Sequence, residues 1–184
     1  RSAALLLDNV SQIFPDETAN ISLKSIEVLL QTKGEMEDQA LKRECGMLVL
    51  GAIASGCQVA LAASLPVIFP YFLEGMGDAF PEVRAISCWV QSRYCSWLIS
   101  TVREGEDGDG NGIFKSMLHR LNLSLLDSSP KVQSSCCAAI STVLEATDPK
   151  LTLPYIESIL EQLRQAYDSG LYGFKNRLLL MDLI

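Results

Sequence analysis

The sequence predicts an all-α solenoid, in which helical hairpins stack one behind another. Three observations predict this fold: a short pattern recurs at nearly constant spacing, amphipathic helical stripes lie between its occurrences, and no segment alternates apolar and polar residues over a convincing length. The chain has 184 residues, of which 48% are hydrophobic and 20% are charged. This composition excludes a disordered protein and suits one domain or a few stacked repeats.

The recurring pattern is an apolar residue followed by a basic or polar one at the start of a helical run. It occurs at Leu41, Val83, Val132 and Phe174, with spacings of 42, 49 and 42 residues. HEAT and armadillo repeats run about 40–47 residues, and the long spacing contains a polar insert. We therefore expect one solenoid segment of about four and a half repeats, cut from a longer protein, at 1–14 (partial), 20–56, 64–103, 113–146 and 151–184, with the insert at 104–112.

Prolines and glycines mark the expected ends of the helices. Pro81, Pro130 and Pro154 fit the first turn of a helix, because a proline there loses no hydrogen bond. Gly34 and Gly56 are expected to break helices. Each hairpin leaves an apolar face uncovered, so stacking of neighbouring repeats has to provide the core.

A charged pair is expected to link neighbouring repeats. Asp78 precedes Arg84 by six residues across a turn, and the same spacing separates Asp127 from Gln133, without the charge. In HEAT-like repeats such residues form a ladder between neighbours, and we therefore assign them a structural role.

Charge and cysteine content restrict the partners and the compartment. With 15 Lys and Arg against 22 Asp and Glu, the net charge of −7 disfavours nucleic acid and favours a basic partner. The six cysteines lie in apolar surroundings without a C-x-x-C pair, so we expect free thiols in a reducing compartment. The stretch 45–73 has no charged residue and is long enough for a membrane span, but two helices joined at residues 55–58 explain it better. We expect no membrane segment.

No catalytic or metal-binding constellation stands out. His119 is the only histidine, and we expect it to be a surface or packing residue. Residues 107–112 match the first six positions of a calcium loop, but the twelfth position is Leu118 where the loop requires glutamate. We therefore expect neither enzymatic activity nor a cofactor, and interpret 104–112 as a solvated loop between repeats.

An aromatic stripe is the best candidate for a binding surface. Ile86, Trp89, Arg93 and Trp97 follow a spacing that places them on one face of a single helix. A role in the core is the plain alternative, but an unpaired arginine is costly to bury, which favours partial exposure. A partly exposed tryptophan with an arginine one turn away offers a peptide apolar area, a cation–π partner and hydrogen-bond donors.

Two specific motifs stand out, L-G-A-I-A at 50–54 and C-W-x-x-S-R-Y at 88–94, together with the residues at 42–49, 65–70 and 82–87. These stretches closely resemble the transportins, which are nuclear import receptors of the importin-β superfamily, and the resemblance continues more weakly to the C-terminus. It implies a right-handed superhelix of HEAT repeats whose second helices line a concave face. It further implies that cargo proteins carrying extended basic signals ending in Pro-Tyr bind there. Ran GTPase and nucleoporins would bind the intact receptor, which would shuttle between cytoplasm and nucleus.

The resemblance also assigns cargo-contacting roles to matching positions. A pocket for the Pro-Tyr end would be formed by Leu48, Ile86, Trp89 and Arg93. The first helix would contribute to the same end, and acidic residues on the last two concave helices would attract the basic part of the signal. These four further residues are Leu5, Asp8, Glu145 and Asp182.

Some positions depart from the family pattern. Leu5 stands where the family tends to have a small alanine, and Ser55 and Ser134 stand where acidic residues often occur. These changes would reshape the pocket and weaken the attraction for a basic signal. The alternative function is a HEAT scaffold of another class, such as a phosphatase or assembly scaffold, which binds partners through the turns between helices. A scaffold predicts Trp89 and Arg93 buried between repeats, whereas cargo binding predicts an accessible Trp89.

Overall fold

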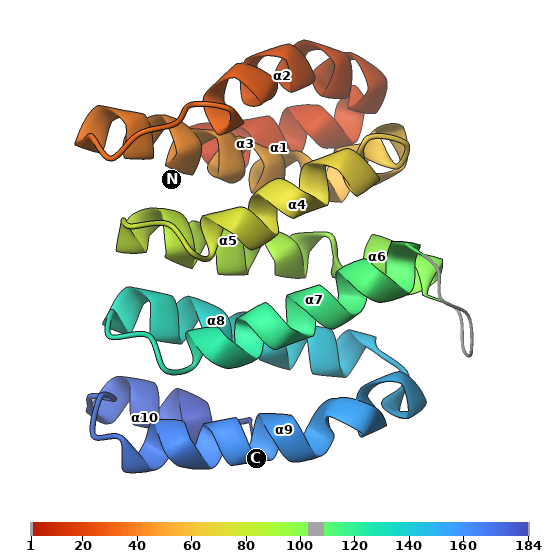
Figure 1. Ribbon diagram of the computed structural model, residues 1–184. Helices are drawn as coiled ribbons and strands as arrows, with labels where there is room; N and C mark the ends of the chain where they lie inside the picture. Colours follow the sequence, from red (N-terminus) through yellow and green to blue (C-terminus); the bar gives the residue numbers. More distant parts are fainter. Residues whose placement is uncertain (1, 103–108, 184) are drawn as a thin grey trace.

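The protein is an all-helical solenoid of stacked hairpins, as the sequence predicts. The computed structural model describes residues 2–102 and 109–183, and in these ranges it contains α-helices and no β-strand (Figure 1). The helices are α1 (Ser2–Ile13), α2 (Pro15–Leu30), α3 (Glu37–Leu61), α4 (Leu65–Gly75), α5 (Pro81–Arg93), α6 (Cys95–Thr101), α7 (Asp109–Ser124), α8 (Pro130–Ala146), α9 (Pro149–Asp168) and α10 (Phe174–Met181).

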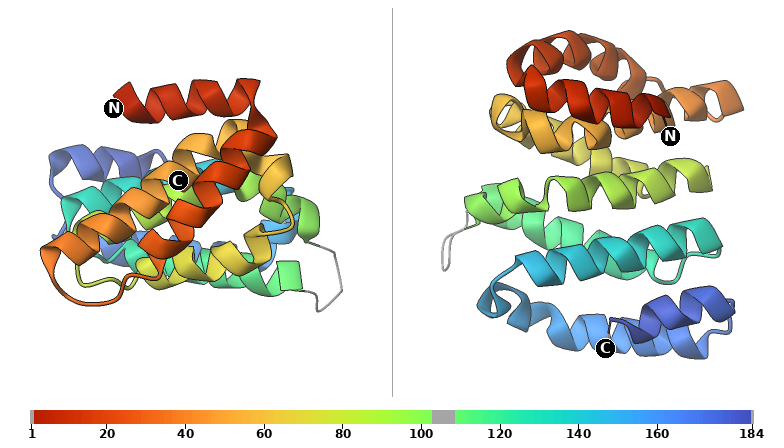
Figure 2. Two further views of the ribbon diagram at one scale, coloured as in Figure 1. Left: turned by 90° about the horizontal axis from the view of Figure 1, so that it is seen from above. Right: turned by 180° about the vertical axis from the view of Figure 1, so that it is seen from behind.

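The helices form two layers. Helices α1, α3, α5, α8 and α10 pack side by side in chain order and form the layer that we call the B layer (Figure 2). Helices α2, α4, α7 and α9 form the opposite A layer, which faces the viewer in Figure 1. Each A helix packs against a B helix of its own repeat, and the short α6 lies between α5 and α7 along the chain.

The core lies between the two layers and is rich in aromatic side chains. Phe72 of α4 stacks on Tyr94, with ring centroids 5.9 Å apart, and both residues are fully buried. The Tyr94 hydroxyl donates a hydrogen bond to the Leu50 carbonyl oxygen at 2.8 Å, and the Tyr172 hydroxyl does the same to Leu125 at 2.6 Å. These two buried tyrosines join the end of α5 and the turn before α10 to the preceding repeats.

The expected charged ladder between repeats is confirmed. Arg43 Nε lies 2.7 Å from Asp78 Oδ2, and Arg84 Nε lies 2.7 Å from Asp127 Oδ2, so each arginine pairs with the aspartate of the next repeat. Arg84 also donates to the carbonyl oxygen of Asp78 in its own turn at 2.9 Å. At the third step Gln133 donates to the Asp127 carbonyl oxygen of its own turn at 2.9 Å. Toward the next repeat it accepts from Asn176 Nδ2 at 2.9 Å, a neutral contact where the ladder has an ion pair.

Two of the expected helix ends are wrong. Gly56 lies inside α3, which continues to Leu61 and turns only at 62–64. A methyl group at Gly56 would overlap the backbone of Ser11, so the glycine allows α1 to approach closely and does not break the helix. Pro154 lies inside α9, which begins at Pro149, because Asp148 caps that end by accepting from the Lys150 amide at 2.9 Å.

The uncharged stretch 45–73 forms most of α3 and α4, two helices that are joined at 62–64 and not at 55–58 as expected. By length and composition, α3 could cross a membrane, but half of its most apolar window is buried inside the protein. Core helices of soluble proteins pass the same test. In this structure α3 packs against α1, α2 and α5, which cover much of its apolar surface.

The remaining sequence predictions concern cysteines and polar residues. All six cysteines are free thiols, and all except the exposed Cys45 are buried. Among the described residues no group of three or more acidic, cysteine or histidine side chains could hold a metal ion. His119 is exposed on α7. The expected loop is wrong for residues 109–112 of the calcium-like motif, because they form the start of α7. The rest of the motif at 107–112 and of the insert at 104–112 lies outside the described residues.

Candidate functional site on the B layer

The aromatic stripe occupies the outer face of α5, but it is shorter than expected. Helix α5 ends at Arg93, and α6 begins at Cys95. The helix ends here because Tyr94 turns into the core toward α3. Trp97 therefore belongs to α6 and stacks on Phe69 of α4 with centroids 5.8 Å apart, so the prediction that it shares a face with Trp89 is wrong.

Trp89 lies half-buried against α3. A methyl group at Gly51 would overlap the six-membered ring of Trp89, so the indole rests directly on the backbone of α3. Glycine is required at this point because any side chain would push the ring away. The indole therefore has one face covered and retains exposed area, an arrangement suited to a second flat or apolar group.

Arg93 is exposed and its guanidinium is held in place by α3. Its Nε donates to the Gly51 carbonyl oxygen at 3.3 Å, and Nη2 donates to the Ser55 hydroxyl. Because no carboxylate pairs with Arg93 among the described residues, its positive charge remains available to a carboxylate or carbonyl group of a ligand. Sequence reasoning noted Ser55 only as a missing acidic residue and did not foresee that it orients Arg93.

The other expected pocket residues lie on the helices that flank this pair. Leu48 of α3 is 40% exposed and Ile86 of α5 is partly exposed, so both add apolar area to adjacent helices of the same layer. On α1, Leu5 is 62% exposed, and the partly buried Asp8 accepts from Gln12 Nε2 at 3.3 Å. Helix α1 packs against α3, so these residues occupy consecutive helices of the B layer.

The two expected acidic positions lie further along the same layer. Glu145 is exposed near the end of α8 and accepts from the Ser141 hydroxyl at 2.7 Å. Asp182 is exposed immediately after α10. The structure therefore distributes the eight candidate residues over five helices or their ends. Of these, Trp89 and Arg93 both contact Gly51 of α3.

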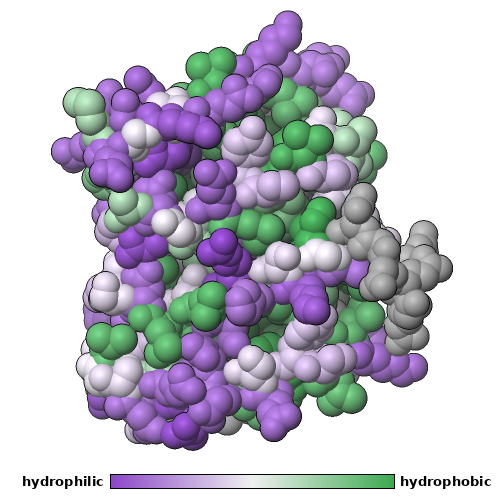
Figure 3. All heavy atoms as spheres, in the orientation of Figure 1, coloured by the Kyte–Doolittle hydropathy of each residue, from purple (hydrophilic) through white to green (hydrophobic). Residues whose placement is uncertain are grey.

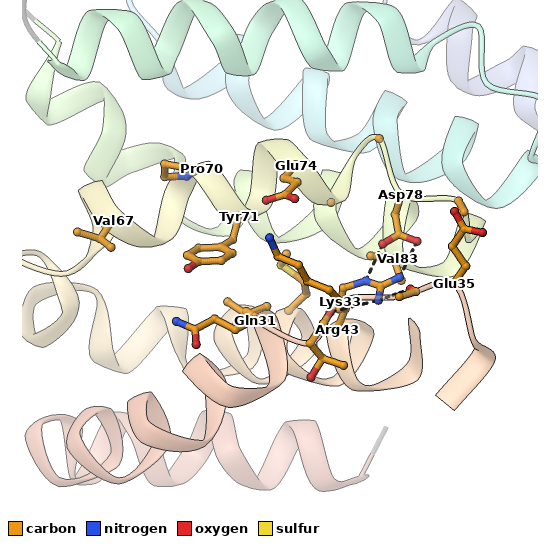
Figure 4. Close-up of a pocket in the computed structure, with 17 residues that line it drawn as sticks. Gln31, Lys33, Glu35, Arg43, Val67, Pro70, Tyr71, Glu74, Asp78 and Val83 are labelled. Carbon is orange, nitrogen blue, oxygen red and sulfur yellow. Dashed lines mark hydrogen bonds and ion pairs between the residues drawn. The ribbon is translucent and has the colours of Figure 1, made fainter. Parts of the chain in front are cut away.

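A separate cleft of about 1030 Å³ lies at the turns between helices. It is bounded by the end of α2, the turn at 31–35 and the outer side of α4. Figure 4 shows Tyr71 and Glu74 of α4 on one side and Gln31 and Lys33 on the other. The Arg43–Asp78 ladder pair closes one end, so two of its charges are already satisfied.

The A layer also has an arginine against an aromatic ring, because Arg177 of α10 lies 5.7 Å from the centroid of the Tyr167 ring of α9. Figure 3 shows hydrophobic and hydrophilic residues interspersed over this face. Its exposed apolar side chains include Val28, Val67 and Leu153, each about 70% exposed. Single exposed apolar residues of this kind are normal on protein surfaces.

Comparison with known proteins identifies the relationship. The family of HEAT-like repeats matches residues 41–90. Transportin from Dictyostelium discoideum is 35% identical over the whole of this chain and 18% of its own length. Human transportin-1 is 32% identical and importin subunit beta-2 from Schizosaccharomyces pombe is 33% identical, each over the whole of this chain and 19% of its own length. This chain is homologous to a segment of the transportins.

A solved structure supports the same architecture. A crystal structure of a mutant of the karyopherin Kap121p superposes with a TM-score of 0.78 over 97% of this chain and 16% of that one. At 19% sequence identity this likeness shows the fold alone. The chain spans about a fifth of the length of the transportins that it matches.

Proposed function

We propose that this chain is the cargo-binding segment of a transportin-like nuclear import receptor. Its B layer would form a concave face that binds extended basic signals ending in Pro-Tyr. The observation that supports this most strongly is the half-buried Trp89 on Gly51 with Arg93 fixed beside it. An apolar side chain of the signal would stack on the indole while Arg93 binds polar groups at the end of the signal.

The charge of the chain supports a basic ligand. The net charge is −7, and the exposed carboxylates Glu145 and Asp182 lie on the same layer as the aromatic pair. They would attract the lysines and arginines of an extended signal, and the attraction would weaken as salt is raised. We propose that Leu48 and Ile86 complete the apolar pocket, and that Leu5 and Asp8 border it.

The longer receptor would provide the remaining functions. Ran GTPase and nucleoporins would bind it, Ran would release cargo, and the receptor would shuttle between cytoplasm and nucleus. The proposal includes no catalysis, cofactor, nucleic acid or membrane contact.

The alternative of a HEAT scaffold of another class has one observation in its favour, the cleft at the turns near Tyr71 and Lys33. However, that alternative predicts Trp89 and Arg93 buried between repeats, whereas Arg93 is exposed and Trp89 is only half-buried.

A fluorescence anisotropy titration tests the proposal. A labelled basic peptide ending in Pro-Tyr is titrated into the native chain, Trp89→Ala and the control Leu153→Ala, after all three show equal helicity by circular dichroism. A buried aromatic anchor contributes about 2 kcal/mol, so Trp89→Ala should weaken binding about 30-fold. Leu153 is 71% exposed on the A layer, and its truncation should leave the affinity unchanged.

Equal binding by the native chain and Trp89→Ala would reject the B-layer site. An equal loss of binding in Leu153→Ala and Trp89→Ala would likewise reject a specific role of Trp89. Binding that depends on Tyr71 and Lys33 and not on Trp89 would favour the scaffold alternative.

A further inference from the structure

An ion pair links two B-layer helices that are not neighbours. Lys131 Nζ of α8 lies 3.9 Å from Glu44 Oε1 of α3. Helix α5 packs against both α3 and α8 and lies between them in the layer (Figure 2). The two side chains are 55% and 29% exposed, so they meet across the exposed side of α5. This pair therefore differs from the ladder pairs, which join adjacent repeats and are more deeply buried.

The register of the repeats explains how the two side chains meet. Glu44 follows the ladder residue Arg43 by one position, and Ala85 follows the corresponding Arg84 by one position. Ala85 is buried, so its side chain does not project from the exposed side of α5. Glu82, two positions before Arg84, is exposed and has no ion-pair partner among the described residues.

The contact with Lys131 shows that the Glu44 carboxylate is accessible to a basic side chain on this layer. The pair is too exposed to add much stability, since exposed ion pairs contribute little and are screened by salt. It can therefore open readily, and an incoming cation needs only to replace one weak contact. A guanidinium can bind a carboxylate through two parallel hydrogen bonds, whereas an ammonium group acts as a point charge.

We propose that Glu44 is a subsite for an arginine of the bound peptide, and that Lys131 occupies this subsite in the free protein as an internal competitor. The inference rests on the proposed function, because it assigns a specificity element to the same peptide-binding layer. Binding would exchange the ammonium group of Lys131 for the guanidinium of the ligand at the Glu44 carboxylate. The competitor would discriminate against peptides that have no arginine at the matching position.

A double-mutant cycle on the 184-residue chain tests this inference. The probe is a labelled Pro-Tyr peptide with one upstream arginine, compared with the same peptide carrying glutamine instead, at low salt. Lys131→Gln should raise the affinity for the arginine peptide about two- to fivefold, which corresponds to the loss of one exposed ion pair. In the Glu44→Gln background the same substitution should give a much smaller gain, and the glutamine peptide should show none.

The control is a lysine of the B layer that does not pair with Glu44. Lys42→Gln removes an equal charge from α3, but Lys42 pairs with Asp38 at 3.8 Å and not with Glu44, so its effect should not depend on Glu44. An equal gain from Lys131→Gln with and without Glu44, or no gain with native Glu44, would overturn the inference. If the native chain and all variants bind neither peptide, the proposed function itself fails.

Discussion

Substitution of Asp127 by asparagine tests whether the ladder holds adjacent repeats together. Asp127 accepts from Arg84 Nε at 2.7 Å and from Arg84 Nη2 at 3.0 Å, and it also accepts from the Ser129 amide at 2.8 Å. Asparagine keeps the size of the side chain but removes the charge. Because the asparagine Nδ2 cannot accept from an N–H group, the substitution removes the ionic part and one hydrogen bond of the contact between α5 and the turn before α8.

The burial of the pair sets the expected magnitude. The side chains of Arg84 and Asp127 are 18% and 12% exposed, so they lie between exposed pairs, worth about 0.2–1 kcal/mol, and fully buried ones, whose disruption costs about 3–5 kcal/mol. We expect Asp127→Asn to lower the free energy of unfolding by about 2 kcal/mol. For a chain of this length such a loss lowers the Tm by about 4–8 °C.

Urea unfolding followed by circular dichroism measures this loss. The control is Asp168→Asn, which breaks an ion pair to Arg164 at 3.1 Å whose side chains are 60% and 62% exposed. We expect the control to cost less than about 0.5 kcal/mol. If both substitutions have the same effect, or if Asp127→Asn costs less than the control, the ladder does not stabilise the stack and the reasoning is wrong.

Two further predictions concern pH and a buried hydroxyl. Burial pushes the pKa of Asp127 upward, but the hydrogen bonds from Arg84 and the Ser129 amide and the charge of Arg84 outweigh it, so the pKa lies below 3.8. The contribution of this carboxylate is therefore fully present above the unfolded-state pKa and is lost as pH falls through the lower folded-state pKa. The difference in free energy of unfolding between the native chain and Asp127→Asn should stay constant between about pH 5 and 7 and narrow below about pH 4. A difference that stays constant below about pH 4 would contradict the lowered pKa of Asp127. Tyr94→Phe removes the buried hydrogen bond to Leu50 and should lower the free energy of unfolding in urea by about 1 kcal/mol. The control Tyr167→Phe, at a 48% exposed position, should cause no measurable loss. Equal losses in the two variants would refute a stabilising role of the Tyr94 hydrogen bond.

The features that the sequence predicts correctly are those repeated at a fixed spacing. The apolar-basic pattern recurs once per repeat, and the ladder residues Arg84 and Asp127 stand at constant positions within it. Such periodic signals are visible in a single sequence because each repeat reports the same local structure. The all-helical solenoid and the ladder could therefore be predicted before any contact was known.

The features that the sequence does not predict depend on contacts between distant residues. The helix after Pro81 ends at Arg93 because Tyr94 turns toward Leu50, a partner 44 residues earlier. Gly56 remains helical because α1 approaches it closely, and nothing in the local sequence shows this approach. The same holds for the candidate site, where the contacts of Trp89 and Arg93 with α3 appear only in the folded chain.

The central claim is that the B layer, and specifically the face around Trp89, binds the Pro-Tyr end of a basic peptide. Photo-crosslinking tests this claim most directly, using a signal peptide whose tyrosine is replaced by benzoyl-phenylalanine, followed by mass spectrometric mapping of the adduct. The proposal predicts adducts within α3 and α5, on segments containing Leu48 or residues 86–93, and their loss on competition with unlabelled peptide. Adducts confined to the A layer or to the cleft around Tyr71, or adducts that unlabelled peptide does not reduce, would contradict it.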